Sequence, residues 1–253
     1  MIFVLGGNGF IGSAICKYLE DHQMPYQSII RENYSSFIGK SCDVLINANG
    51  NSKKYIAEKE PVIDFDLSVR SVRSSIQDFK YGKYIYLSSC DVYEDCSSEK
   101  TTQEDSKILN INVSNYGFHK YLAEEIVRGR CRDWMIVRMG GFVGPGLKKN
   151  PVFDILNNHK LWLHPDSQLQ YLHVNSFADI LIKSVLQQKN KILNIAGAGT
   201  VKLRNLMEYC NYDGDLSEAL RFVKYDISIA KIQRLSAVPN SIDEVFSFIK
   251  IGF

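Results

Sequence analysis

The sequence predicts an α/β fold built on a doubly wound parallel sheet. Short, continuous apolar runs such as residues 2–5 recur along the chain and alternate with segments whose apolar side chains repeat at helical spacing. The first run ends in glycines at positions 6, 9 and 12, and the helical period begins directly after them. Continuous apolar runs are typical of strands buried on both faces, as in parallel sheets covered by helices.

The glycine turn after the first strand has the spacing of a dinucleotide site. Glycine in such a turn lets the backbone approach a pyrophosphate, and the last glycine lets helix and strand pack closely. Amide donors and the positive end of the following helix then hold the anion. The residues expected to contact the cofactor here are Gly6, Asn8, Gly9, Phe10, Ile11 and Gly12.

Composition argues against several classes of function. The 30 Lys and Arg nearly balance the 28 Asp and Glu among 253 residues, so nothing indicates a nucleic-acid or membrane partner. No apolar run approaches the ~20 residues that span a bilayer, and we expect no leader segment. The six cysteines are scattered without a Cys-x-x-Cys pattern or a histidine cluster. We therefore expect free thiols in a reducing cytoplasm, and no metal site.

The second strand is predicted at residues 26–30, and the charges after it bear on cofactor choice. The position just past this strand normally contacts the adenosine ribose. A carboxylate there binds the 2′-hydroxyl, whereas an arginine accommodates a 2′-phosphate. Arg31 lies at about this position, which favours NADP(H) over NAD(H). A shift of one residue would instead place Glu32 on the ribose, so NAD(H) stays possible.

The next passage is unusually short. Only residues 33–42 separate the second strand from the apolar run at 44–48, whereas a parallel crossover needs about a dozen residues. We therefore expect an outer strand and its helix to be missing or vestigial, which leaves the sheet with a trimmed edge. The carboxyl end of the 44–48 strand, at Asn47, Ala48 and Asn49, is expected beside the cofactor.

The remaining strands and helices are predicted from the same two patterns, which are short continuous apolar runs for strands and apolar side chains at helical spacing for helices. His119 is expected to be a surface or packing residue. Strands are predicted at 83–88, 134–138, 170–174 and 191–196, and loops at 94–112 (on the surface) and 140–146 (mobile). Helices are predicted at 61–79, 114–130, 151–159, 176–188 (capped by Asn175 or Ser176), 201–210 and 242–249.

Three residues are candidates for catalysis. Tyr116 and Lys120 are four apart in the helix predicted at 114–130, so they share one face. Hydride transfer at a carbon bearing oxygen requires a proton to move on that oxygen. We expect the Lys120 ammonium to lower the tyrosine pKa from about 10 towards neutrality, so that Tyr116 serves as acid or base. Lys120 is also expected to bind the nicotinamide ribose, and Ser89 to donate a hydrogen bond to the substrate oxygen.

The glycine turn, Ser89 and the Tyr116–Lys120 pair, in this order, resemble the extended branch of the short-chain dehydrogenase/reductase superfamily. Further stretches similar to that branch, also in order, are 87–93, 144–146, 171–175, 193–197 and 226–242. The resemblance covers nearly the whole chain and implies a Rossmann fold, a nicotinamide cofactor and a nucleotide-sugar substrate. It also implies a homodimer through the helices at 61–79 and 114–130.

The chain departs from the family pattern at positions that bear on the substrate. In the family's dehydratases, Asp and then Glu follow the catalytic hydroxyl. Here Cys90 and Asp91 stand at these positions, which disfavours dehydration. An asparagine and an arginine common in the family are also missing, so we expect Lys148, Lys149 or Arg204 to bind the nucleotide.

These features together predict an NADP(H)-dependent oxidoreductase that reduces a nucleotide-linked keto-sugar at C4, with Tyr116 as the acid. The alternatives are a nucleotide-sugar 4-epimerase with retained NAD and a non-catalytic dinucleotide sensor. We expect a dinucleotide-binding domain at 1–144 with 169–196, and a small C-terminal substrate-binding cap at 145–168 with 197–253.

Overall fold

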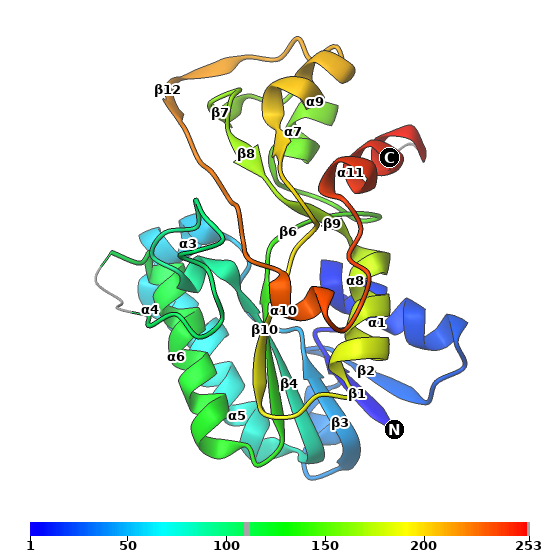
Figure 1. Ribbon diagram of the computed structural model, residues 1–253. Helices are drawn as coiled ribbons and strands as arrows, with labels where there is room; N and C mark the ends of the chain where they lie inside the picture. The colour runs from blue at the N-terminus through cyan, green and yellow to red at the C-terminus, as the bar shows by residue number, and fades with distance from the viewer. Residues whose placement is uncertain (109–111, 252–253) are drawn as a thin grey trace.

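The structure is a computed structural model that describes residues 1–108 and 112–251. Its centre is a parallel sheet of six strands in the order β2-β1-β3-β4-β5-β10 (Figure 1). The predicted doubly wound parallel sheet is confirmed. The strands are β1 (Ile2–Leu5), β2 (Tyr26–Ile29), β3 (Ser41–Asn47), β4 (Lys80–Ser89), β5 (Trp134–Met139) and β10 (Lys191–Ile195).

The edge of the sheet at β2 is trimmed, as the short passage after this strand predicts. β2 is the outermost strand on its side, and β1 lies between it and β3. The chain passes from β2 to β3 with only the four-residue helix α2 (Tyr34–Phe37) between them. A complete strand–helix unit is therefore reduced to one helical turn.

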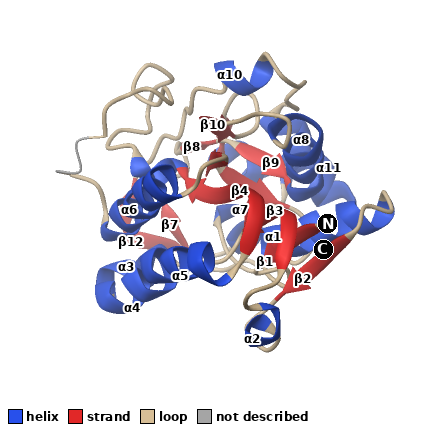
Figure 2. Ribbon diagram, turned by 90° about the horizontal axis from the view of Figure 1, so that it is seen from below, coloured by secondary structure: helices blue, strands red, loops and turns tan. Residues whose placement is uncertain are grey.

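Helices cover both faces of the sheet (Figure 2). On one face α1 (Phe10–Asp21) packs against α8 (Val174–Ile180), and on the other α5 (Ser71–Asp78) packs against α6 (Asn115–Arg130). Side chains alternate along β1 as the pleat requires: Val4 belongs to the core under α1 and α8, and Phe3 and Leu5 to the core under α5 and α6. Burial on both faces explains the continuous apolar run.

Several predicted bounds need correction. The helix predicted at 61–79 is α4 (Pro61–Phe65), a wider π-helical turn (Asp66–Arg70) and α5, preceded by the unpredicted α3 (Lys54–Lys59). The loop predicted at 140–146 contains β6 (Gly141–Val143), which pairs with β9 (Tyr171–His173). The helix predicted at 176–188 begins at Val174, because His173 rather than Asn175 or Ser176 supplies its cap by accepting from the Asn175 amide at 3.2 Å.

The polar stretch 94–112 is not simply a surface loop. Thr102 and Glu104 are buried, and Glu104 accepts a hydrogen bond from the Asn194 amide of β10 at 3.0 Å. The Asn194 side chain donates to the Thr102 carbonyl at 2.6 Å. The stretch therefore covers the β10 edge of the sheet through polar contacts, which hydrophobic periodicity does not detect. Residues 109–111 lie outside the described part of the chain.

A third apolar cluster lies among the C-terminal elements above the sheet (Figure 1). These elements include two-stranded pairings of β7 (Leu161–Leu163) with β12 (Leu216–Arg221) and of β8 (Gln168–Leu169) with β11 (Val201–Lys202). Ile227, Ile229 and Ile232, however, pack into the main core, and the predicted domain division stays a prediction. The helices among them are α7 (Pro151–Leu156), α9 (Leu203–Tyr209) and α11 (Ser241–Ile251), whereas α10 (Ala230–Gln233) packs against β10.

None of the helices described is both long enough and apolar enough to cross a bilayer. All six cysteines are free thiols, and four of them are buried.

A buried ion pair joins α6 to β5. The Arg138 guanidinium donates to both carboxylate oxygens of Glu124, at 2.7 Å from Nη2 and 3.1 Å from Nε, and both side chains are almost fully buried. The Ser88 hydroxyl of β4 donates to the same carboxylate at 2.6 Å. Because each charge has a partner in the dry interior, the pair fixes the position of α6 against two strands.

Replacing Glu124 with alanine is expected to lower the free energy of unfolding by about 3–5 kcal/mol, because Arg138 would stay buried without its partner. The adjacent Glu125 offers a matched control, since its 2.6 Å pair with Arg128 lies at the surface. Glu125→Ala should cost less than about 1 kcal/mol. Urea denaturation of both variants measures the difference, and equal losses would contradict the role given to the buried pair.

Candidate active site

The glycine turn between β1 and α1 has the close contacts that its spacing predicts. Gly6 adopts a φ of 76°, in the region that favours glycine. A Cβ at Gly12 would lie 2.1 Å from the Gly6 carbonyl oxygen, so only glycine lets α1 begin this close to the strand. Gly7 was not among the predicted site residues, yet a Cβ there would lie 2.2 Å from the Ser28 hydroxyl oxygen.

The carboxyl end of β3 lies directly beside this turn. The Ala48 carbonyl oxygen is 3.1 Å from the position that a Cβ on Gly6 would take. The buried Asn47 side chain accepts from the Asn49 amide at 2.9 Å and donates to the Tyr84 hydroxyl at 2.7 Å. Asn47 therefore shapes the turn, while Ala48 and Asn49 form its surface next to the glycines.

Arg31 lies in the turn after β2, beside the same glycine turn. The Gly6 amide donates to the Ile29 carbonyl at 2.8 Å, which joins the ends of the two strands. Asn33 holds the turn by accepting from the Ile30 amide at 2.8 Å. Arg31 and Glu32 are both exposed, so both side chains are accessible to a ligand at this turn.

The helix α6 carries Tyr116 and Lys120 into the site. Its N-terminus is capped by Ser114, whose hydroxyl accepts from the Gly117 amide at 3.2 Å. A Cβ at Gly117 would lie 2.0 Å from the Asp91 carbonyl oxygen, so this glycine lets α6 pack directly on the turn after β4. Both side chains are buried, and the Lys120 ammonium lies 5.8 Å from the centre of the Tyr116 ring.

The Lys120 ammonium faces the turn after β3. It lies 3.3 Å from the position that a Cβ on Gly50 would take, and Gly50 has a φ of 127°. Burial lowers the pKa of Lys120 to about 8, although the carboxylates of Asp64, Glu124 and Asp91 oppose this change. The structure thus brings the predicted lysine and the β3 turn together.

Burial raises the pKa of the Tyr116 hydroxyl above its ordinary value. The charge of Asp91 acts in the same direction, whereas Lys54 and a hydrogen bond with Ser89 act against it. The expected lowering of this pKa is therefore wrong for this geometry, because the cost of burying a phenolate is the largest contribution. Tyr116 is a neutral phenol at pH 7, which is the form that donates a proton.

Ser89 lies at the end of β4 in a polar cluster that the sequence did not predict. Its hydroxyl donates to the Asp91 carboxylate at 2.9 Å, and the expected donation to a substrate oxygen stays a prediction. The other carboxylate oxygen accepts from the Lys54 ammonium and from the Tyr225 hydroxyl, each at 2.7 Å. Lys54 and Tyr225 are 37 and 134 residues from Asp91, and no local motif marks either of them.

His119 is a buried packing residue with a polar partner. Its Nδ1 lies 2.7 Å from the carboxylate of Asp64 on α4, and the other oxygen of this carboxylate accepts from the Asn51 amide group at 2.7 Å. Asp64 is fully buried. The contact joins α4 and the turn after β3 to the helix that carries Tyr116 and Lys120.

The three residues predicted to bind a nucleotide differ in their surroundings. Arg204 pairs with Asp166, at 2.9 Å, and Lys148 is exposed. Lys149 donates to the Ser52 hydroxyl at 3.1 Å, in the segment that follows the β3 turn. Lys149 is also exposed, but the protein atoms around its ammonium displace part of its water and, with the ammonium groups of Lys53 and Lys54, lower its pKa to about 8. Lys149 is therefore the one of the three that lies near the polar cluster around Ser89.

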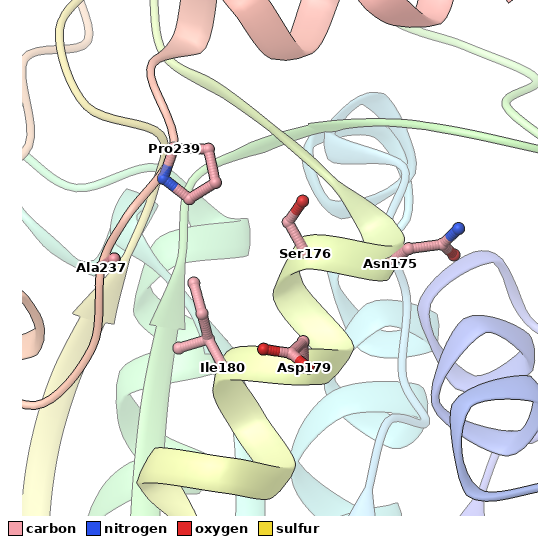
Figure 3. Close-up of a pocket in the computed structure, with 6 residues that line it drawn as sticks. All are labelled: Asn175, Ser176, Asp179, Ile180, Ala237 and Pro239. Carbon is pink, nitrogen blue, oxygen red and sulfur yellow. The ribbon is translucent and has the colours of Figure 1, made fainter. Parts of the chain in front are cut away.

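A cavity of about 310 Å³ opens elsewhere, between α8 and the segment before α11 (Figure 3). It contains none of the predicted site residues, and we assign it no part in the candidate site. Its lining residues are Asn175, Ser176, Asp179, Ile180, Ala237 and Pro239.

Solved structures with the same fold cover almost the whole chain. MoeE5 in complex with UDP-glucose and NAD is 13% identical, with 98% of this chain and 97% of that chain covered and a TM-score of 0.85. A dTDP-4-dehydrorhamnose reductase from Bacillus anthracis in complex with NADP is 14% identical (99% and 97% covered, TM-score 0.79). A UDP-glucose 4-epimerase from Thermotoga maritima with UDP-glucose is 16% identical (99% and 98% covered, TM-score 0.73).

A search of curated protein sequences finds no significant match. The model of the NAD dependent epimerase/dehydratase family, in contrast, matches residues 2–196, which is most of the chain. The protein thus belongs to the NAD-dependent epimerase/dehydratase family, whose members are nicotinamide-dependent enzymes of the extended short-chain dehydrogenase type.

Proposed function

We propose that the protein reduces a nucleotide-linked keto-sugar, at C4, with NADPH as the preferred hydride donor. The observation that carries this proposal is the position of a neutral, buried phenol, Tyr116, between Ser89 and the Lys120 ammonium. A neutral phenol is the protonation state that a reduction requires, because the substrate oxygen must gain a proton.

The residues around the glycine turn fit a dinucleotide. Gly6 and Gly12 have no Cβ at positions where a Cβ would come too close to neighbouring backbone atoms, so the turn stays open to a ligand. The N-terminus of α1 follows this turn directly. We assign the pyrophosphate to this turn, the 2′-phosphate to Arg31 and the nicotinamide ribose to Lys120. The nicotinamide ring, when bound, supplies the hydride.

The proton comes from the chain itself. Tyr116 donates its hydroxyl proton to the sugar oxygen, and a phenolate forms in a buried site. The Lys120 ammonium, one helical turn along, stabilises this negative charge. We therefore assign Tyr116 as the acid and Lys120 as the residue that makes its deprotonation possible.

The nucleotide end of the substrate is assigned to Lys149. The ammonium groups of Lys53 and Lys54 both lower the pKa of Lys149, so three positive side chains lie close together beside the polar cluster around Ser89. Lys54 is already paired with Asp91, so we assign the phosphate contacts to Lys53 and to Lys149, whose ammonium Ser52 holds in place. The nucleotide sugars in similar structures, such as UDP-glucose in the Thermotoga maritima epimerase, support this class of substrate.

We also propose that the protein forms a homodimer through the helices next to the site. α3 and α4 pack on α6, and they present large apolar side chains to solvent. Such a patch on packed helices is typical of an interface between subunits. The exposed side chains are Tyr55, Val62, Ile63 and Phe65, of which Val62 is 74% exposed.

A thermal-shift screen tests the proposed function. UDP- and dTDP-linked hexoses and keto-hexoses are each combined with NADP(H) and with NAD(H). We expect the largest increase in Tm with a keto-sugar nucleotide and NADP(H) together, because ligands that bind only the folded state stabilise it. Purified protein that already absorbs at the reduced-nicotinamide band, and turns over without added cofactor, would indicate the 4-epimerase instead.

Tyr116→Phe is expected to lower kcat by about 10²–10⁴, because the proton donor is removed. Binding of NADPH, measured by fluorescence titration, should stay nearly unchanged. Tyr121→Phe, on the same helix, is the matched control and should keep full activity. Turnover by the Tyr116 variant at the wild-type rate would remove the assigned acid.

Arg31→Ala is expected to weaken NADPH binding by more than about tenfold and NADH binding only slightly, because the guanidinium is assigned to the 2′-phosphate. The neighbouring variant Glu32→Ala tests the other register. A selective loss of NADH affinity in that variant, with NADPH unaffected by Arg31→Ala, would reverse the cofactor assignment.

A further inference from the structure

The Lys120 ammonium is a buried charge without a hydrogen-bonded partner. Lys120 is 4% exposed, and no atom in the described part of the chain accepts a hydrogen bond from its Nζ. The carboxylates that favour its charged form are those of Asp64 on α4, Glu124 on α6 and Asp91 after β4, and each of them is paired with another side chain. A buried charge is costly without close partners. The ammonium therefore needs a stabilising contact besides a direct ion pair.

Two aromatic rings supply such a contact. Nζ of Lys120 lies 5.6 Å from the centre of the Tyr86 ring and 5.8 Å from the centre of the Tyr116 ring. A cation within about 6 Å of a ring centre is attracted by the negative face of the ring, and the attraction is stronger where water is excluded. Tyr86 is 0% and Tyr116 8% exposed, so both contacts lie in a dry part of the site.

The ring, and not the hydroxyl, is the part of Tyr86 that makes this contact. The hydroxyl oxygen of Tyr86 is buried and has no hydrogen-bond partner among the residues that the structure describes. Tyr84, two residues earlier on β4, shows the opposite case, because its hydroxyl accepts from Asn47 at 2.7 Å and lies 2.7 Å from the Ser75 hydroxyl. An unpaired buried hydroxyl does not stabilise the fold, so the contribution of Tyr86 to this site is its aromatic face.

We propose that Tyr86 is a positioning residue: its ring face keeps the Lys120 ammonium charged and in place for the dinucleotide. This inference rests on the assignment of Lys120 to the nicotinamide ribose and deepens it. Tyr116 cannot supply the whole contact, because its hydroxyl is assigned to the substrate. Burial already lowers the pKa of Lys120 to about 8, and without the Tyr86 ring this effect of burial would meet less opposition.

Fluorescence titration with NADPH and with NADH, from about pH 6.5 to about pH 9.5, tests the proposal. Wild-type affinity should fall as the pH rises through about 8, where Lys120 loses its proton. In Tyr86→Leu the midpoint of this fall should move down by about half a unit to one unit, because the ammonium loses one attractive face. In Tyr86→Phe the midpoint should stay, because the face remains, and Tm should not fall, because the lost hydroxyl has no partner.

Phe79→Leu is the matched control, because it removes a ring from the same apolar cluster. The Phe79 ring packs edge-on against the rings of Phe3 and Tyr34, and its removal should leave the midpoint unchanged. Lys120→Met should abolish the fall in affinity, and in that background Tyr86→Leu should cause no further shift. If Tyr86→Leu does not fold, Tyr86→Met replaces it, since methionine fills irregular space without an aromatic face.

An unshifted midpoint in Tyr86→Leu would overturn the role of the ring while leaving Lys120 on the dinucleotide. The same conclusion would follow from an equal shift in Phe79→Leu or in Tyr86→Phe. Wild-type affinity that shows no fall, or a fall that persists in Lys120→Met, would overturn the assignment of Lys120 to the nicotinamide ribose, and the role of Tyr86 with it.

Discussion

The constraint on which the site depends is that α6 must hold an ammonium group inside the protein. A buried charge is costly unless opposite charges and hydrogen bonds surround it. Lys120 has three carboxylates near it, on Asp64, Glu124 and Asp91, and each is fixed by partners from a different element. The position of α6 is therefore set by polar contacts as well as by apolar packing, and the position of Tyr116 follows from it.

Much of this arrangement was predictable because it depends on short spacings. Three glycines at intervals of three, and Tyr116 four residues before Lys120, are local patterns that can be identified directly in the chain. The trimmed sheet edge was predictable from the length of the segment 33–42, because ten residues are too few for a full helix and a further strand. The family match and the strand order confirm the fold class that these patterns predicted.

The rest depends on contacts between distant parts of the chain. Lys54 and Tyr225 contact Asp91 because three segments that are distant in the sequence come together after β4. Hydrophobic periodicity along the chain gives no sign of these contacts. The predicted direction of the Tyr116 pKa shift was wrong, because the shift is dominated by burial of the hydroxyl. The spacing of residues along a helix does not show how deeply a side chain is buried. Glu104 was predicted to lie on the surface for a similar reason. Its burial depends on a hydrogen bond from the Asn194 amide, which belongs to a strand far away in the sequence.

The trimmed edge has a consequence for how the protein behaves in solution. With no strand beyond β2 in the described part of the sheet, the outer backbone edge of Tyr26–Ile29 has no strand partner, and the Asn33 side chain covers part of it by donating to the Ser28 carbonyl at 3.1 Å. Open strand edges of this kind can recruit the edge of another molecule and seed aggregation. Here the edge strand is only four residues long, and the charged Arg31 and Glu32 lie just beyond it; both a short edge strand and nearby charges are devices by which natural sheets discourage such association.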